Sequence, residues 1–204
     1  MTHFSLSPKD SPRVAVACAP AALPQSYYLM DPVPTELLTA NELPFDLTLK
    51  KVTFGPAGST ESDDLSGLAH VWVDYQPNSL AWPVVSARLR EVIDQQASGL
   101  EHHEWVPVHV HGRGEASRPY YLLRFQQPND VLDYEQSTFH RPDDRPALLV
   151  KPVFVQEKIA PLCVFAGDPE QWQITSHLFV SQAVRAAAKR AGLVGLHYEP
   201  CRVG

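Results

Sequence analysis

Cysteine is scarce in this 204-residue sequence. Its three cysteines, Cys18, Cys163 and Cys201, are far apart and form no C-x-x-C pair, so neither a disulfide framework nor a zinc knuckle is indicated. A chain of this length buries about 70% of its unfolded surface, so it needs no covalent cross-link to fold. We therefore expect a reduced protein of the cytoplasm.

Long apolar runs are also missing. The longest uncharged run, residues 14–30, is interrupted by Pro20 and Pro24, so no transmembrane helix and no membrane partner are predicted. The apolar stretch before Cys18 has four residues, fewer than the roughly seven to 15 of a signal peptide. We expect residues 1–26 to form an irregular arm rich in proline and alanine, attached to one domain spanning residues 27–204.

An excess of positive charge is the third absence. Seventeen lysines and arginines stand against 23 acidic residues, which gives a net charge of -6. Nucleic-acid-binding proteins are usually basic, so we expect no nucleic acid partner, whereas a basic protein partner is favoured. The 44% of hydrophobic and 20% of charged residues exclude wholesale disorder, and the 19 prolines favour short strands over long helices.

Familiar catalytic motifs are absent as well. The sequence contains no G-x-S-x-G elbow, no H-E-x-x-H, no phosphate-binding Walker loop and no G-x-G-x-x-G. We therefore expect no enzymatic activity and no cofactor. One alternative stays open, because His109 and His111 alternate on a predicted strand and would place two imidazoles on the same face, as in some metal sites.

Two segments are predicted to be helices, because apolar residues recur at helical spacing from about residue 86 to 97 and from 181 onward. Each begins at a serine, Ser86 or Ser181, whose hydroxyl oxygen can accept a hydrogen bond from a free backbone N–H. Each precedes a Gly-Leu pair, which starts at Gly99 or Gly192 and is typical of a helix end.

The two helical segments also lead into matching stretches of sequence. Trp105 and Pro107 follow the first Gly-Leu pair at the same distances at which Tyr198 and Pro200 follow the second. We interpret this match as a repeated unit, in which a capped helix leads into a strand. Two similar solutions to one packing problem are the alternative explanation.

Short strands are predicted where apolar and polar residues alternate, or where short apolar runs are bounded by turn residues. The segments concerned are residues 27–30, 45–54, 68–75, 103–111, 120–125, 147–155 and 162–165. The expected fold class is α+β, with a mostly antiparallel sheet, two principal helices and the irregular N-terminal arm.

Acidic residues provide the candidates for a binding surface. Glu61, Asp63 and Asp64 lie in a hydrophilic stretch, residues 59–67, which is predicted to be an exposed loop. Catalysis would need a carboxylate in an apolar pocket, so a solvated face is the simpler interpretation. The same loop is suited to docking into a cationic cleft of a protein partner. Further candidates for partner contacts are Glu101, Glu104, Trp82 and Trp172.

The order of several short motifs resembles a known family. These motifs are Val84-Val-Ser-Ala-Arg-Leu89, Trp105-Val-Pro-Val108, Tyr120-Tyr-Leu-Leu123, Asp130-Val-Leu-Asp133 with Ser137, Phe165, Val180-Ser181 and Ala191-Gly-Leu-Val-Gly-Leu196. Over about residues 65–200 the chain resembles family eleven of the immunity proteins of bacterial polymorphic toxin systems. The N-terminal arm and residues 35–65 depart from the family pattern.

The resemblance implies a small cytoplasmic protein, encoded beside a toxin, that binds and silences this toxin in the producing cell. It implies no catalytic residues, so none is assigned. We therefore expect a stoichiometric inhibitor whose partner is a cognate toxin or secreted effector. A metal-dependent enzyme using His109 and His111, and an adaptor that binds a toxin without inhibiting it, are the alternatives.

Overall fold

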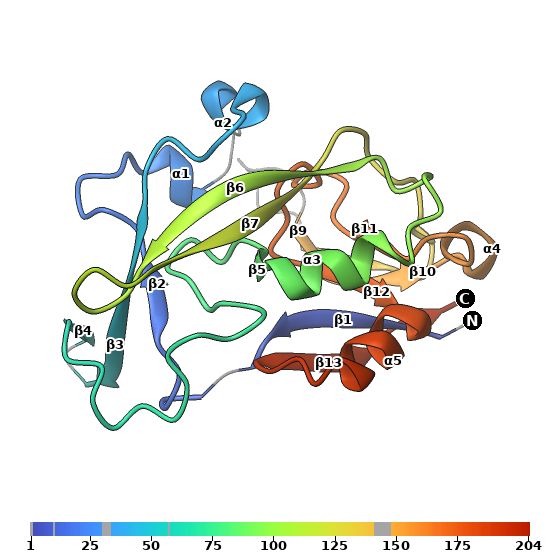
Figure 1. Ribbon diagram of the computed structural model, residues 1–204. Helices are drawn as coiled ribbons and strands as arrows, with labels where there is room; N and C mark the ends of the chain where they lie inside the picture. The colour runs from blue at the N-terminus through green and yellow to red at the C-terminus, as the bar shows by residue number, and fades with distance from the viewer. Residues whose placement is uncertain (1, 10, 30–33, 57, 141–147) are drawn as a thin grey trace.

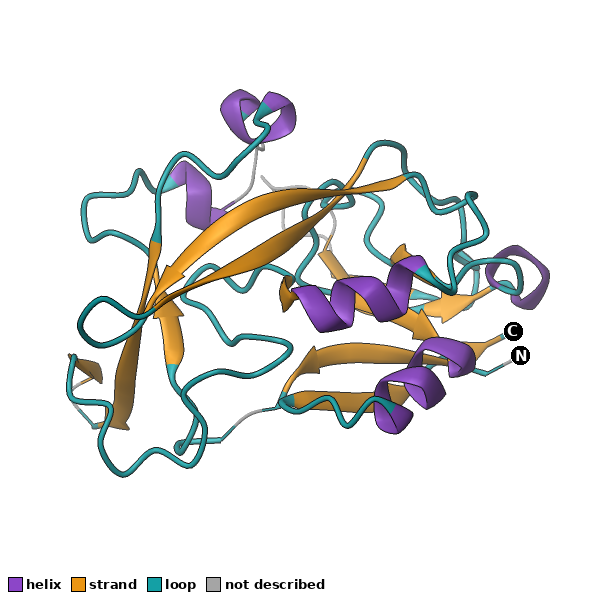
Figure 2. Cartoon of the chain, viewed as in Figure 1, coloured by secondary structure: helices purple, strands orange, loops and turns teal. Residues whose placement is uncertain are grey.

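The structure is a computed structural model that describes residues 2–9, 11–29, 34–56, 58–140 and 148–204 (Figure 1). These ranges contain 14 strands and five helices (Figure 2). The strands form sheets that are mostly antiparallel. Only two of these five helices have more than five residues. The predicted α+β class with two principal helices is therefore confirmed.

A four-stranded antiparallel sheet combines the first strand of the chain with three strands from its C-terminal part. In spatial order its strands are β11 (Val164–Ala166), β12 (Leu178–Ser181), β1 (His3–Pro8) and β13 (Leu196–Pro200). The prediction of an irregular arm at residues 1–26 is wrong for β1, which pairs with β12 on one side and β13 on the other. Phe4 and Leu6 alternate with serines and are buried, which is the pattern of a half-buried strand.

A second, larger sheet contains most of the remaining strands. In spatial order these are β2 (Val16–Cys18), β3 (Leu47–Gly55), β6 (His103–His111), β7 (Ser117–Phe125) and β5 (Val84–Ser86). All neighbouring strands in this sheet are antiparallel except β3 and β6, which are parallel. A further strand, β4 (Gly58–Ser62), pairs with the last five residues of β3. Because β2 belongs to this sheet, the second half of the expected arm is also partly regular.

The two principal helices are α3 (Ala87–Asp94) and α5 (Gln182–Arg190), which lie side by side across the sheets (Figure 1). Their predicted serine caps are confirmed, since Ser86 Oγ accepts from the Leu89 N–H and Ser181 Oγ from the Val184 N–H. Apolar side chains of both helices and both sheets form one buried cluster, which includes Leu6, Leu89, Leu123, Val180 and Val184. This cluster joins the two sheets into one packed body.

The repeated unit predicted from the sequence is present in the structure. β5, α3 and β6 form one β-α-β unit, and β12, α5 and β13 form another. In each unit the two strands flank a third strand that runs antiparallel to both, β7 in the first unit and β1 in the second. The pairing is equivalent in both units. In the first unit, Ser86 lies opposite Tyr120 and Pro107 opposite Tyr121. In the second unit, Ser181 lies opposite His3 and Pro200 opposite Phe4.

Equivalent arginines complete the correspondence. Arg90 follows the cap serine of α3 by four residues and lies 4.5 Å above the ring of Tyr121. Arg185 follows the cap serine of α5 by four residues and lies 4.3 Å above the ring of Phe4. Tyr121 and Phe4 are themselves equivalent in the two sheets, so each helix is fixed to its middle strand by the same kind of cation–π contact.

The remaining elements are short. They are α1 (Ser26–Leu29), α2 (Thr35–Thr39), α4 (Gln156–Ile159), β8 (Thr138–His140), β9 (Leu148–Lys151), β10 (Val153–Phe154) and β14 (Arg202–Val203). Two predicted strands are wrong: residues 26–29 are helical, and residues 68–75 pair with other segments only through single β-bridges, at His70 and Tyr75. In the described part of the chain, no helix is long and apolar enough to cross a membrane.

Candidate protein-interaction surface

We call Glu61, Asp63 and Asp64 the acidic cluster. The cluster lies on and beside a β-hairpin that projects from the large sheet, at the lower left of Figure 1. The prediction of a loop at residues 59–67 is wrong for its first part, since β4 pairs with β3 from Lys51 opposite Ser62 to the turn at Gly55 and Gly58. Every residue of β4 is exposed to solvent. We call residues 51–62 the β3–β4 hairpin.

The three acidic side chains of the cluster are all exposed but differ in their partners. Glu61 Oε2 is 2.7 Å from Lys50 Nζ, so its charge is partly neutralised within the chain. The backbone N–H and the hydroxyl of Ser66 donate to the Asp64 carboxylate at 3.0 and 2.8 Å and hold the pKa of Asp64 below its usual range. The Asp64 carboxylate therefore presents negative charge to solvent at neutral pH, and the side chain of Asp63 next to it in the chain is also exposed.

Phe54, next to the turn of the β3–β4 hairpin, is a candidate that the sequence analysis missed. Its side chain is 85% exposed, and it belongs to none of the hydrophobic clusters formed by the described residues. A signal was present in the sequence: Leu47 and Leu49 occupy odd positions of β3 and are buried, whereas Phe54 occupies an even position on the opposite face. Aromatic side chains are enriched at protein interfaces, so the exposed ring is a candidate contact.

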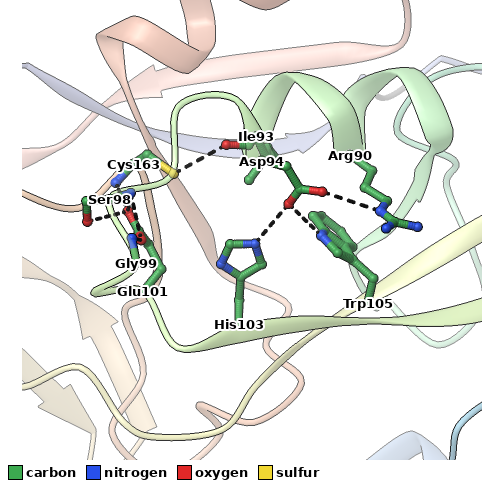
Figure 3. Close-up of polar contacts among 9 residues, drawn as sticks. All are labelled: Arg90, Ile93, Asp94, Ser98, Gly99, Glu101, His103, Trp105 and Cys163. Atoms are coloured by element: carbon green, nitrogen blue, oxygen red, sulfur yellow. Dashed lines mark hydrogen bonds and ion pairs between the residues drawn. The ribbon is translucent and has the colours of Figure 1, made fainter.

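Glu101 is not available to a partner, so its assignment to the binding surface is wrong. Its carboxylate is fully buried and accepts the backbone N–H groups of Cys163, Gly99 and Ser98 at 2.8, 2.9 and 3.1 Å (Figure 3). Burial alone would raise the pKa of Glu101, but the N–H groups of Cys163 and Ser98 outweigh burial and lower this pKa. The carboxylate joins the loop after α3 to the segment before β11.

Glu104 is partly accessible but also has a structural contact. Its Oε1 atom is 2.6 Å from Arg124 Nε, and its side chain is 35% exposed. Arg124 is buried and also donates to the carbonyl of Leu37 in α2. A partner could reach one edge of the Glu104 carboxylate only in competition with this ion pair.

The two candidate tryptophans differ in exposure. Trp82 is 2% exposed and packs beside Tyr27 and Phe45, with ring centroids 6.4 Å apart in both pairs, so its assignment as a surface anchor is wrong. The side-chain amide of Asn78 binds both the N–H and the carbonyl of Trp82 and so fixes the backbone of the turn. Trp172 is half-buried and packs against the cluster shared by the two sheets.

His109 and His111 lie on one face of β6 but bind two different carboxylates. His109 Nε2 is 3.0 Å from Glu42 Oε1, and His111 Nε2 is 2.7 Å from Asp46 Oδ2. Among the described residues, no three His, Cys, Asp or Glu side chains are grouped so that they could hold a metal ion. The geometry therefore gives no support to the metal-enzyme alternative.

The thiol of Cys163 is buried beside the C-terminal end of α3 (Figure 3). The thiol donates to the carbonyl of Ile93 at 3.7 Å, and burial raises its pKa. Nearby, Asp94 accepts from the indole N–H of Trp105 at 2.8 Å and is 3.2 Å from His103 Nε2. A protonated thiol without access to solvent is a packing group rather than a nucleophile.

The chain thus combines an α+β fold with an exposed hairpin that carries an unburied aromatic ring and an acidic cluster, features typical of a protein that binds another protein. A family model described as Immunity protein family (Imm11) matches residues 55–203, and the chain belongs to this family. The resemblance inferred from the sequence is therefore confirmed, and the match also includes β4 and the acidic cluster. A search of curated proteins gives no match.

Proposed function

We propose that this immunity protein neutralises a cognate toxin by binding it in a stoichiometric complex, without a chemical reaction of its own. The observation that carries the proposal is membership of the immunity family over residues 55–203. The toxin is proposed to be encoded beside the immunity gene. The encounter is proposed to take place in the cytoplasm, where the chain would protect the producing cell.

The β3–β4 hairpin is proposed to enter the cleft in which the toxin binds its substrate. Phe54 would be the apolar anchor, and Asp63 and Asp64 would meet basic side chains at the rim of the cleft. A net charge of -6 favours approach to a basic partner. A stable complex of this kind buries about 1,200–2,000 Å² in total, so the hairpin would form the centre of a larger contact.

Replacement of Phe54 tests the anchor. We expect Phe54→Ala to weaken toxin binding by about 2 kcal/mol or more, because an aromatic ring buried at the centre of an interface is lost. Its unfolding temperature should not change, since the ring is exposed in the free protein. Isothermal titration with the product of the neighbouring gene measures the affinity, and Tyr134→Ala, at a ring that is 57% exposed elsewhere, is the control.

Charge reversal tests the acidic cluster separately. Asp63→Lys with Asp64→Lys should slow association about tenfold or more at low salt and leave dissociation less affected, because exposed charges act mainly by steering the encounter. Surface plasmon resonance at two salt concentrations measures both rates. Glu135→Lys with Glu170→Lys makes the same change of charge at two other exposed acidic positions. Equal association rates for both double variants would remove the acidic cluster from the interface.

Co-expression tests inhibition itself. A cell that makes the toxin together with the intact chain should grow, and a cell that makes the toxin with a non-binding variant should not. A toxin that still kills while it is bound to the chain would identify the chain as an adaptor instead. A toxin that never binds the chain would contradict the proposed function as a whole.

A further inference from the structure

A basic groove runs along a part of the surface that the β3–β4 hairpin does not include. One hollow of about 290 Å³ is lined by Trp72, Arg88, Arg118 and Tyr120. A second hollow of about 380 Å³ is lined by Lys9, Arg13 and His70, and both hollows share Val194. We call this continuous surface the Arg–Val groove.

Three cationic side chains of the Arg–Val groove, those of Lys9, Arg13 and Arg118, are exposed to solvent. Among the described residues, no carboxylate lies within ion-pair distance of Lys9, Arg13 or Arg118; Asp10 is outside the described residues. The guanidinium carbon of Arg118 lies 4.8 Å above the ring of Trp72, which holds this exposed side chain in place. The groove is thus a cationic surface on an acidic protein.

Asp74 is the one described acidic residue of the groove, and its carboxylate is directed inward. Its side chain is only 5% exposed, whereas that of its ion-pair partner Arg88 is 56% exposed. Asp74 accepts from the Ser86 hydroxyl at 2.6 Å and from the Val194 N–H at 2.8 Å. The carboxylate is therefore occupied within the protein, and so is Arg88, whose Nη2 atom donates to the carbonyl of Ala191.

Backbone contacts hold the floor of the groove in its shape. The Lys9 N–H donates to the carbonyl of Gly195, and the Asp74 N–H donates to the carbonyl of Val194, both at 2.9 Å. Gly195 has a φ of +79°, and a Cβ atom there would lie 2.5 Å from Val73 Cβ. Glycine at this position lets the two segments approach closely, so the groove is formed before any ligand binds.

We propose that the Arg–Val groove binds an acidic segment of a protein partner. Carboxylates of the segment would pair with Arg118 in one hollow and with Arg13 in the other. An apolar side chain between these carboxylates would cover Val194, which is 41% exposed at the junction. Arginine forms bidentate hydrogen bonds with carboxylates, and a charge-complementary partner is the ligand that this lining fits.

A nucleic acid fits the groove less well than an acidic peptide. Stacking of bases needs a free aromatic ring, and the described lining of the groove provides no free Phe, Tyr or Trp ring. The indole of Trp72 already stacks with Tyr120, with centroids 6.2 Å apart and an interplanar angle of 22°, and contacts Arg118. The groove is distinct from the hairpin, so the proposal does not depend on the function proposed above.

The test uses the full-length protein and a fluorescein-labelled peptide with four glutamates on each side of one leucine. Fluorescence anisotropy at low salt should show saturable binding that weakens as salt is added. Arg118→Glu should weaken binding about tenfold, and Arg118→Gln should weaken it less. Lys151→Glu makes the same charge change as Arg118→Glu at an exposed lysine outside the groove and should bind the peptide like the unchanged protein.

Three results would overturn the proposal. The unchanged protein does not bind the peptide, Arg118→Glu and Lys151→Glu lose binding equally, or the protein binds an oligothymidylate more tightly than the peptide. Circular dichroism and the unfolding midpoint of each variant verify that it is folded. Because no toxin is used, failure here leaves the proposed immunity function untouched, and failure of toxin binding leaves this result intact.

Discussion

The carboxylate of Glu101 accepts N–H groups from a nearby turn, at Ser98 and Gly99, and from Cys163, which is 62 positions further along the chain than Glu101. A neutral amide at this position would provide one acceptor oxygen instead of two and would bring two donors into a site that already contains donors. Each unsatisfied buried group costs about 1–3 kcal/mol. The residue is therefore a structural link between the loop after α3 and the segment before β11.

We predict that Glu101→Gln lowers the free energy of unfolding by about 1–3 kcal/mol at pH 7. The pKa of Glu101 in the folded protein is lowered from its ordinary value of 4.5, so its charge stabilises the fold above that value. This contribution is lost as the pH falls through the folded-state pKa. Urea unfolding from pH 7 down to about pH 3.5 should therefore show the difference between variant and unchanged protein becoming smaller.

A matched control for this variant is Glu135→Gln, at an exposed glutamate. It should leave the free energy of unfolding nearly unchanged at every pH. If the difference for Glu101→Gln were constant from pH 7 to pH 3.5, the ionised carboxylate would not be the source of the stabilisation.

At the scale of elements, the caps of the two principal helices differ in one contact. Ser86 Oγ accepts from the Leu89 N–H and also donates to Asp74 at 2.6 Å, whereas the contact of Ser181 Oγ is the N–H of Val184, at 3.4 Å. We predict that Ser181→Ala lowers the free energy of unfolding by about 1 kcal/mol. Ser86→Ala should lower it by about 2–3 kcal/mol, because Asp74 also loses a hydrogen bond.

Urea unfolding of both variants measures this difference, with the slope against denaturant concentration verifying that the unfolding transition stays comparable. Ser86→Thr keeps the hydroxyl and should therefore lower the free energy of unfolding much less than Ser86→Ala does. Equal losses in the two alanine variants would show that the bond from Ser86 to Asp74 contributes no net stability.

Local patterns were sufficient to predict several elements. The serine caps and the helical spacing identified α3 and α5, and the alternation of residues 103–111 identified β6 with its observed bounds. For α5, the predicted end at Gly192 is also correct, since the N–H groups of Gly192 and Leu193 bond back to the helix. α3 ends earlier than predicted, at Asp94, and Gly99 lies in the loop beyond it.

Long-range contacts account for what the sequence could not predict. Burial of Glu101 depends on the donor at Cys163, and burial of Trp82 depends on the cluster formed with Tyr27 and Phe45. Neither partner is close in sequence to the residue that it covers. Phe54 shows the converse, because its place on the face of β3 opposite to Leu47 and Leu49 follows from the local alternation of the strand.

At the scale of the whole molecule, the segment that matches the family is not independent of the chain before it. The match covers residues 55–203, but β1, β2 and nearly all of β3 precede it. β1 fills the middle of the four-stranded sheet, where Leu6 is 1% exposed. Without β1, the facing edges of β12 and β13 would lose their hydrogen-bond partners.

We predict that a fragment of residues 55–204 has no cooperative unfolding transition, whereas the full-length chain does. Circular dichroism during heating and in urea measures this for both proteins. Leu6→Ala in the full-length chain is a milder test and should cost about 2–5 kcal/mol, because it leaves a cavity in the core. A fragment that unfolds cooperatively, with the strand content of the full-length protein, would show that residues 1–54 are dispensable for folding.

The position of β1 between β12 and β13 has a consequence for the timing of biosynthesis. About 170 residues separate β1 from Leu178, where its first partner strand begins. At about 5–20 residues per second, a ribosome takes roughly 10–30 s to translate that interval, during which β1 has neither of its neighbours. The four-stranded sheet can therefore close only when synthesis of the chain is nearly complete, so completed chains rather than nascent ones have the whole fold.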